Sequence, residues 1–155
     1  MKVLLAALLL GAAPALAQER LLDPSAADSA RGTALTVLQH LAAGELEQAA
    51  AWSNAPRRRF EVLRDYRDSV GEEAFKRAFG RFLEPGNRLV AEVAIGPRRL
   101  LVWALGDASG ELAGQFYVEV DGKFLLDDVP SRERDELRRV LRRYRAEQKK
   151  SGTEP

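Results

Sequence analysis

Apolar residues recur along the chain at two periods, and the change from one to the other falls at Pro85. Before that point the spacing is three and four residues, which is typical of helices that bury one face. The predicted helices span residues 28–43, 45–52, 56–70 and 72–82. Gly44 stands where the first helix needs a C-cap. Ser53 or Asn54 is expected to cap the third helix, with Pro56 in its first turn.

Beyond Pro85 the period falls to two residues, which predicts strands. The predicted strands span residues 88–95, 99–105, 115–120 and 123–129. Gly96-Pro97 and Asp121-Gly122 predict hairpins, since a type I′ turn needs the positive φ that Asp and Gly tolerate. A last helix over 131–148 starts at Ser131, a suitable N-cap. The order predicts an α+β fold, with N-terminal helices packed on a curved antiparallel sheet of about four strands and a C-terminal helix.

The first seventeen residues are typical of a secretory signal peptide. Lys2 gives a positive start, residues 3–13 are apolar, and Ala15-Leu16-Ala17 is a small-x-small cleavage pattern. A membrane-spanning helix would need about twenty apolar residues. We therefore expect cleavage between Ala17 and Gln18 and a periplasmic or secreted bacterial protein. The expected organisation is then a flexible leader over 18–27, a single domain with a basic C-terminal helix over 28–148, and a disordered tail over 149–155.

Composition excludes several classes of protein. The chain has 24 basic and 23 acidic residues, a balance that argues against a nucleic-acid-binding protein. It has no cysteine, so disulfides, a lipoprotein anchor, a thiol nucleophile and thiolate metal ligands are all excluded. With a single histidine, His40, the usual ligand set of a zinc site is also missing. We expect no metal and no cofactor.

The segment 33–129 resembles the NTF2-like superfamily of α+β cones. The resemblance rests on a helix that ends in Gly44-Glu45 before a short Ala-rich helix, on the run of antiparallel strands, and on the closing hairpin Val118–Asp128. It implies a curved sheet around an apolar pocket that binds a small ligand. Family enzymes place Asp, Tyr or His inside the cone, but those motifs have no convincing match here. The basic helix after Val129 is an addition to the simple cone.

The expected pocket lies on the concave face of the sheet. Its predicted lining consists of Trp103, Phe116, Val118, Phe124 and Asp128. The aromatic members of this set are equally suited to form the core between the sheet and the helices, and both interpretations predict the same sequence pattern. The sequence alone therefore leaves cavity and core open as alternatives.

Two groups of titratable residues are candidates for chemistry. His40 would act as a general base only with a partner carboxylate and an oriented pocket. Adjacent strand residues point to opposite faces, so only one of Asp127 and Asp128 can face the interior. If Asp128 lies on the same face as Phe124, it is buried and its pKa is raised. The alternative is that Asp127 and Asp128 cap the last helix or pair with Arg132. We therefore expect no enzyme, and keep as an alternative a pocket enzyme that uses Asp128 with Tyr117 or His40.

The charge asymmetry is carried by the run Arg57-Arg58-Arg59 and by the last helix. Residues 131–150 include nine basic and four acidic residues. Its predicted apolar stripe is Leu137, Val140, Leu141 and Tyr144, and its flanking arginines are Arg138, Arg139, Arg142 and Arg143. Such a helix can lie on an anionic membrane or contact a protein partner, or it can simply pack on its own sheet. We expect a binding or accessory protein with a small apolar ligand, and keep an envelope interaction protein and homodimerisation as alternatives.

Overall fold

The computed structural model describes residues 24–107 and 109–152. The expected signal peptide, its cleavage site and the end of the predicted tail lie outside these residues. The helices on the N-terminal side of the sheet are η1 (Pro24–Asp28), α2 (Ala30–Ala43), α3 (Leu46–Ala50), α4 (Pro56–Val70), α5 (Glu72–Gly80) and η2 (Arg81–Leu83). The strands are β1 (Arg88–Ile95), β2 (Arg98–Ala104), β3 (Leu112–Val120) and β4 (Lys123–Leu126), and α6 (Arg132–Ser151) follows. The α+β fold predicted from the pattern is confirmed.

The four strands form one antiparallel sheet in the order β1-β2-β3-β4, so each strand pairs with its neighbours in sequence. Asp121 and Gly122 have φ of 50° and 76°, the left-handed conformation expected of their turn. The strand β4 is short and pairs with only Tyr117–Val120 of β3. The first half of β3 therefore has a free edge on the side away from β2.

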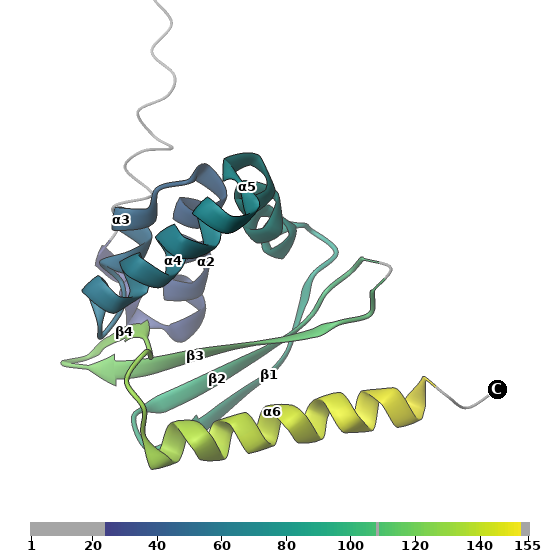
Figure 1. Cartoon of the computed structure of the whole chain (residues 1–155). Coiled ribbons are helices and arrows are strands. Elements are labelled where there is room, and N and C mark those ends of the chain that lie inside the picture. Colours follow the sequence, from purple (N-terminus) through teal and green to yellow (C-terminus); the bar gives the residue numbers. More distant parts are fainter. Residues whose placement is uncertain (1–23, 108, 153–155) are drawn as a thin grey trace, which may run out of the picture.

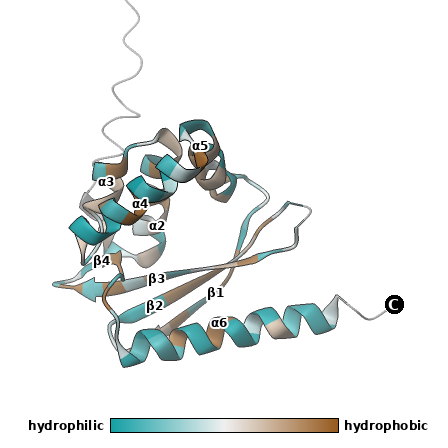
Figure 2. Cartoon of the chain, in the orientation of Figure 1, coloured by the Kyte–Doolittle hydropathy of each residue, from teal (hydrophilic) through white to brown (hydrophobic). Residues whose placement is uncertain are grey.

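Helices cover both faces of the sheet. Figure 1 shows α2 to α5 gathered over one face, with α6 lying alone across the other. The first face buries Leu101, Trp103 and Tyr117 against Ala30 and Ala34 of α2. The second buries a cluster against α6 that includes Leu100, Val102, Leu112, Leu137 and Leu141. In Figure 2 the ribbon of α6 is mostly coloured hydrophilic, with a few hydrophobic residues, as expected for a helix that packs through one stripe.

Gly114 allows α6 to approach β3 closely. A Cβ at this position would lie 2.2 Å from Leu141 Cδ2. The helix itself starts at Ser131, whose hydroxyl accepts a hydrogen bond of 3.1 Å from Arg134 N, as predicted. None of the helices among residues 24–107 and 109–152 is long and apolar enough to cross a membrane.

Several element boundaries differ from the prediction. The helix α6 runs to Ser151 rather than Gln148, and residues 24–28, part of the expected leader, form a 3₁₀ helix whose Ala27 is buried. The predicted cap of α4 is wrong: its N-cap is Ala55, and no side chain caps it. The reason is tertiary, because Ser53 and Asn54 instead bond to the two aspartates that follow β4.

Candidate functional site

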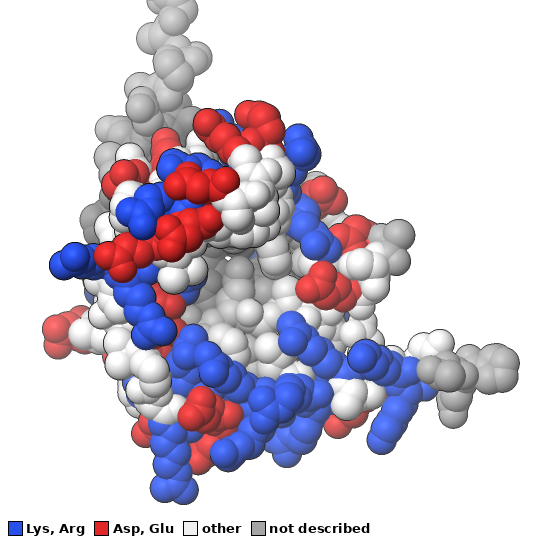
Figure 3. All heavy atoms as spheres, in the orientation of Figure 1, with Lys and Arg blue, Asp and Glu red and all other residues white. Residues whose placement is uncertain are grey.

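A cavity of about 350 Å³ opens between the helical layer and α6. Figure 3 shows this hollow, with basic side chains gathered along its α6 side. Its apolar wall consists of Val37, Leu38, Leu41, Leu63, Phe79, Phe82, Ala113, Phe116 and Leu126. Its remaining lining consists of Arg59, Glu111, Gly114, Gln115, Tyr117, Asp127, Arg134 and Arg145. The volume falls in the usual range of small-molecule sites.

The free edge of β3 forms the floor of the cavity. Because β4 stops pairing at Tyr117, residues of β3 that point to either face reach the cavity: Gln115 and Tyr117 from the helical side, and Phe116 from the side of α6. The cavity therefore lies between the helical layer and α6, beside the part of β3 that β4 does not pair with. The apolar wall comes from α2, α4, α5 and η2 together with β3 and β4, while α6 contributes two arginines.

Gln115 is oriented by two aromatic residues. Its Oε1 accepts hydrogen bonds from Trp103 Nε1 at 3.0 Å and from the hydroxyl of Tyr117 at 3.3 Å. Burial raises the pKa of the Tyr117 phenol, so this hydroxyl stays protonated and donates. With Oε1 occupied, the amide of Gln115 has its donor group left to offer a ligand.

Asp127 is the fully buried carboxylate of the site. Its side chain has no exposed surface and accepts hydrogen bonds from Arg98 Nε at 2.9 Å and Asn54 Nδ2 at 3.0 Å. Its backbone N–H donates to Phe116 O at 3.0 Å, which continues the pairing of β3 for one residue beyond β4. A buried carboxylate held by a cation and an amide is a structural ion pair, as such charges require.

Asp128 lies beside a smaller cavity of about 140 Å³ that shares Arg134 with the main one. Its carboxylate accepts from Arg59 Nε at 2.8 Å, from Arg59 Nη2 and from the Ser53 hydroxyl at 2.6 Å. Arg58 and Arg138 also line this space. A single carboxylate thus stands among several arginines, and it is already engaged by one of them.

Arg134 has the most unusual surroundings of the lining residues. Its guanidinium carbon lies 5.5 Å from the centre of the Phe116 ring, and its Nε is buried without a hydrogen-bond partner. Burial, followed by the nearby charge of Arg138, lowers the pKa of Arg134. No ion pair to this side chain occurs among the described residues. A donor is therefore held at the cavity with nothing to receive it.

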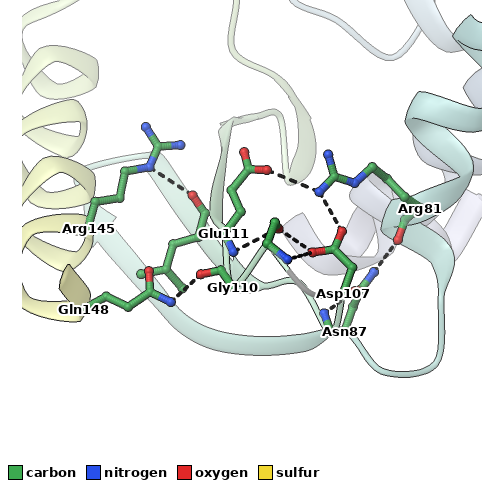
Figure 4. A network of polar contacts seen from close by, with 10 residues as sticks. Arg81, Asn87, Asp107, Gly110, Glu111, Arg145 and Gln148 are labelled. Atoms are coloured by element: carbon green, nitrogen blue, oxygen red, sulfur yellow. Dashed lines mark hydrogen bonds and ion pairs between the residues drawn. The ribbon is translucent and has the colours of Figure 1, made fainter. Parts of the chain in front are cut away.

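A polar network at the loop between β2 and β3 (Figure 4) borders the cavity through Glu111. Arg81 Nη2 bonds Asp107 Oδ2 at 2.7 Å and Glu111 Oε2 at 3.3 Å. Asp107 also accepts from Ser109, and these contacts, with Ser109 first, lower the pKa of Asp107. The network links η2 of the helical layer to the loop that α6 contacts.

The α6 side of this loop is held by two side chains of that helix. Arg145 Nε donates to Leu112 O at 2.9 Å, and Gln148 Nε2 donates to Gly110 O at 2.6 Å. Figure 4 shows both side chains reaching from α6 toward the loop. The loop is therefore anchored to both coverings of the sheet.

Of the five residues predicted to line a pocket, one lines the main cavity. This residue is Phe116. Trp103 is buried in the core under α2, and Phe124 packs against the same cluster. Val118 is buried, and Asp128 lines the smaller cavity. The aromatic residues thus divide between core and cavity.

The residues of the expected catalytic alternative lie in separate surroundings. His40 is buried on α2, and its Nδ1 lies 2.6 Å from Glu45 Oε2. Tyr117 lines the main cavity and Asp128 the smaller one. In residues 24–107 and 109–152 no group of His, Asp and Glu side chains is arranged to hold a metal ion. Neither aspartate caps the last helix, and Arg132 pairs with Glu136 instead.

Sequence reasoning missed Arg59, Arg134, Arg145 and the apolar wall of the cavity apart from Phe116. In the sequence, Arg134 is notable only as the third residue after the N-cap Ser131, a position where a capping box prefers Glu. The charge excess of α6 was the available signal for Arg134 and Arg145, and the run Arg57-Arg58-Arg59 was the signal for Arg59. Nothing in the sequence places the two α6 arginines opposite α2 and α4. Comparison of the chain with protein-family models, with curated proteins and with solved structures finds no match.

Proposed function

We propose that this chain is an exported bacterial protein with an NTF2-like fold that binds a small ligand in its central cavity, and that it acts as a binding or accessory protein rather than an enzyme. The observation that carries the proposal is the cavity of about 350 Å³ between the helical layer and α6. Apolar walls with a few convergent polar groups are the usual character of a small-molecule site.

Three features of the site support this proposal. The apolar wall is contributed by several elements, so a ligand there would be enclosed by the tertiary structure. Gln115 is oriented by Trp103 and Tyr117, which prepares it for a fixed polar contact. The buried acid of the site, Asp127, is engaged by Arg98 and Asn54, an arrangement that suits structural support better than proton transfer.

Native mass spectrometry tests the proposal. The chain would be expressed with its own first seventeen residues, so that export is also examined, and purified without detergent. A defined extra mass that disappears on denaturation is expected. The variant Leu38→Trp fills the cavity, because Leu38 lies in its wall, and should lose this mass. Leu35→Trp is the matched control, since Leu35 is on the same helix but exposed and outside the lining.

One combination of results would contradict a binding function. It is the absence of an extra mass together with no calorimetric binding of decanol or decanoate by the folded protein. Binding that survives in Leu38→Trp as well as in Leu35→Trp would contradict the assignment of the cavity. Circular dichroism of both variants shows whether each is folded.

A second candidate function uses the exposed arginines of α6. Arg138, Arg139, Arg142 and Arg143 are all exposed, so they remain accessible to an anionic surface or partner. Leu137 and Leu141 are buried against the sheet, so such a contact would rely on charge alone. Replacing the four arginines with glutamine should then abolish binding to anionic vesicles while decanol binding is kept.

A further inference from the structure

The acidic residues of the cavity wall are already neutralised by arginines outside it. Glu111 pairs with Arg81 at 3.3 Å, and Asp127 pairs with Arg98 at 2.9 Å. Neither Arg81 nor Arg98 lines the cavity. The negative charges of the lining are therefore unavailable to a cationic ligand.

The arginines of the wall are compensated only in part. Arg59 is engaged on two nitrogens by Asp128. Arg134 and Arg145 form no ion pair among the described residues, although Arg145 donates to Leu112 O. The cavity thus carries an excess of positive charge, concentrated on α6.

Arg134 is the better placed of the two to receive an anion. Its guanidinium packs on Phe116, and its buried Nε lacks an acceptor. A buried donor without a partner costs free energy. The terminal nitrogens of the same guanidinium form no ion pair among the described residues, so they are the donors for a ligand acceptor. Arg138 beside it adds positive charge and lines the smaller cavity together with Arg134.

We propose that the ligand is a single-chain carboxylate: its anionic head binds Arg134, and its apolar body lies along Leu38, Leu41 and Leu63. This inference rests on the proposed function, because it names the ligand class of the same cavity. A guanidinium binds a carboxylate through paired charge-assisted hydrogen bonds, which suits a head group at this position. The cavity volume of about 350 Å³ suits one aliphatic chain and excludes a bulky two-chain lipid.

Calorimetric titration of the full chain with three probes of the same apolar length tests the head group. The probes are decanoate, decanol and decyltrimethylammonium. Decanoate should bind about tenfold more tightly than decanol, because a charge-assisted hydrogen bond is about twice as strong as a neutral one. The cationic probe should bind most weakly.

The variant Arg134→Gln should lower the affinity for decanoate about tenfold and leave that for decanol unchanged. Arg139→Gln is the matched control, because Arg139 is exposed on the same helix and outside the cavity. Arg145→Gln should have a smaller effect, since the Nε of Arg145 is already bonded to Leu112 O.

The outcomes separate this inference from the proposed function. Equal binding of decanol and decanoate by the unaltered protein would overturn the carboxylate and keep the cavity as an apolar site. An unchanged decanoate affinity in Arg134→Gln would overturn the role of Arg134. Failure of all three probes, together with no extra mass in native mass spectrometry, would overturn the binding function itself. The comparison of probes on the unaltered protein decides the matter even if Arg134→Gln does not fold.

Discussion

The two faces of the sheet are covered in different ways. On one face, α2 packs on the strands, α3 and α5 pack on α2, and α4 packs on α3 and α5, so this layer has a core of its own that includes Leu41, Leu46 and Phe75. On the other face α6 lies alone, and its buried residues are Leu137 and Leu141. A layer with its own core should unfold with the whole domain, whereas a single helix can detach locally.

The cavity lies at the boundary between these coverings. Most of its apolar wall belongs to the helical layer, with Ala113, Phe116 and Leu126 from the sheet, and its uncompensated charge belongs to α6. A ligand would therefore link the two coverings along the free edge of β3. The helical layer and α6 should differ in the free energy needed to unfold or detach them. Four variants test this difference, in order from the largest expected effect on stability to the smallest.

The largest effect is expected in the helical layer. Phe75 is fully buried, and its ring lies 4.8 Å from that of Phe79 and 5.7 Å from that of Tyr66. Phe75→Ala should lower the free energy of unfolding by about 4 kcal/mol, because it leaves a large cavity. Urea denaturation measures the loss. Val62→Ala, at an exposed position of α4, should change it by less than about 0.5 kcal/mol.

A somewhat smaller loss is expected where the two coverings are tied together. Asp127 bonds Asn54 on the helical side and Arg98, which also lies 3.7 Å from Glu133 of α6. Asp127→Ala should cost about 3 kcal/mol, since Arg98 loses its buried partner. Hydrogen exchange in α6 should also rise. Asp128→Ala is the neighbouring control, and if it raised exchange in α6 as much, the tie through Asp127 would be refuted.

Leu137→Ala tests the single helix itself. Leu137 is fully buried against the second face of the sheet. Its truncation should cost about 2 kcal/mol, at the low end for a buried leucine, because α6 can detach alone. Hydrogen exchange should rise in α6 and remain slow in β2 and α2. Uniformly faster exchange throughout the domain would show that the two coverings are equally cooperative and that α6 does not detach alone.

The smallest effect concerns Asp107 in the loop that both coverings contact. Because Ser109 and Arg81 lower the pKa of Asp107 in the folded chain, its stabilisation is present at neutral pH and is lost as the pH falls through that lowered pKa. Asp107→Asn should therefore melt at a slightly lower temperature than the unaltered protein at about pH 7. The difference should shrink as the pH falls below the ordinary aspartate pKa of about 3.9, and vanish once both states bind the proton. A pH-independent difference would contradict an electrostatic origin.

Local features of the fold were predictable because they depend on neighbouring residues. Gly44 ends α2 in the left-handed conformation, with φ of 80°, as expected of a residue without a Cβ, and the hydroxyl of Ser131 caps α6. The turn at Asp121-Gly122 follows from the same local chemistry. The change of period at Pro85 marked the boundary between helices and sheet.

The roles of the strand-end residues were not predictable in the same way. Strand alternation suggested Asp128 as the buried carboxylate, yet β4 ends at Leu126 and the fully buried one is Asp127. Ser53 and Asn54 were expected to cap α4, a local role that each could fill. They bond the two aspartates instead, because the fold brings residues more than seventy positions apart into contact.

The chain's own order of residues thus specified its elements, its turns and its α+β class, since periodicity and turn chemistry act over a few residues. Only the tertiary structure decided which side chains meet at the cavity. Arg134 belongs to a helix whose charge excess is visible in the sequence, but its position opposite Leu38 and Leu63 depends on α6 crossing the far face of the sheet. That path is set by packing between distant segments, and Gly114 with Leu141 is one of the contacts that define it.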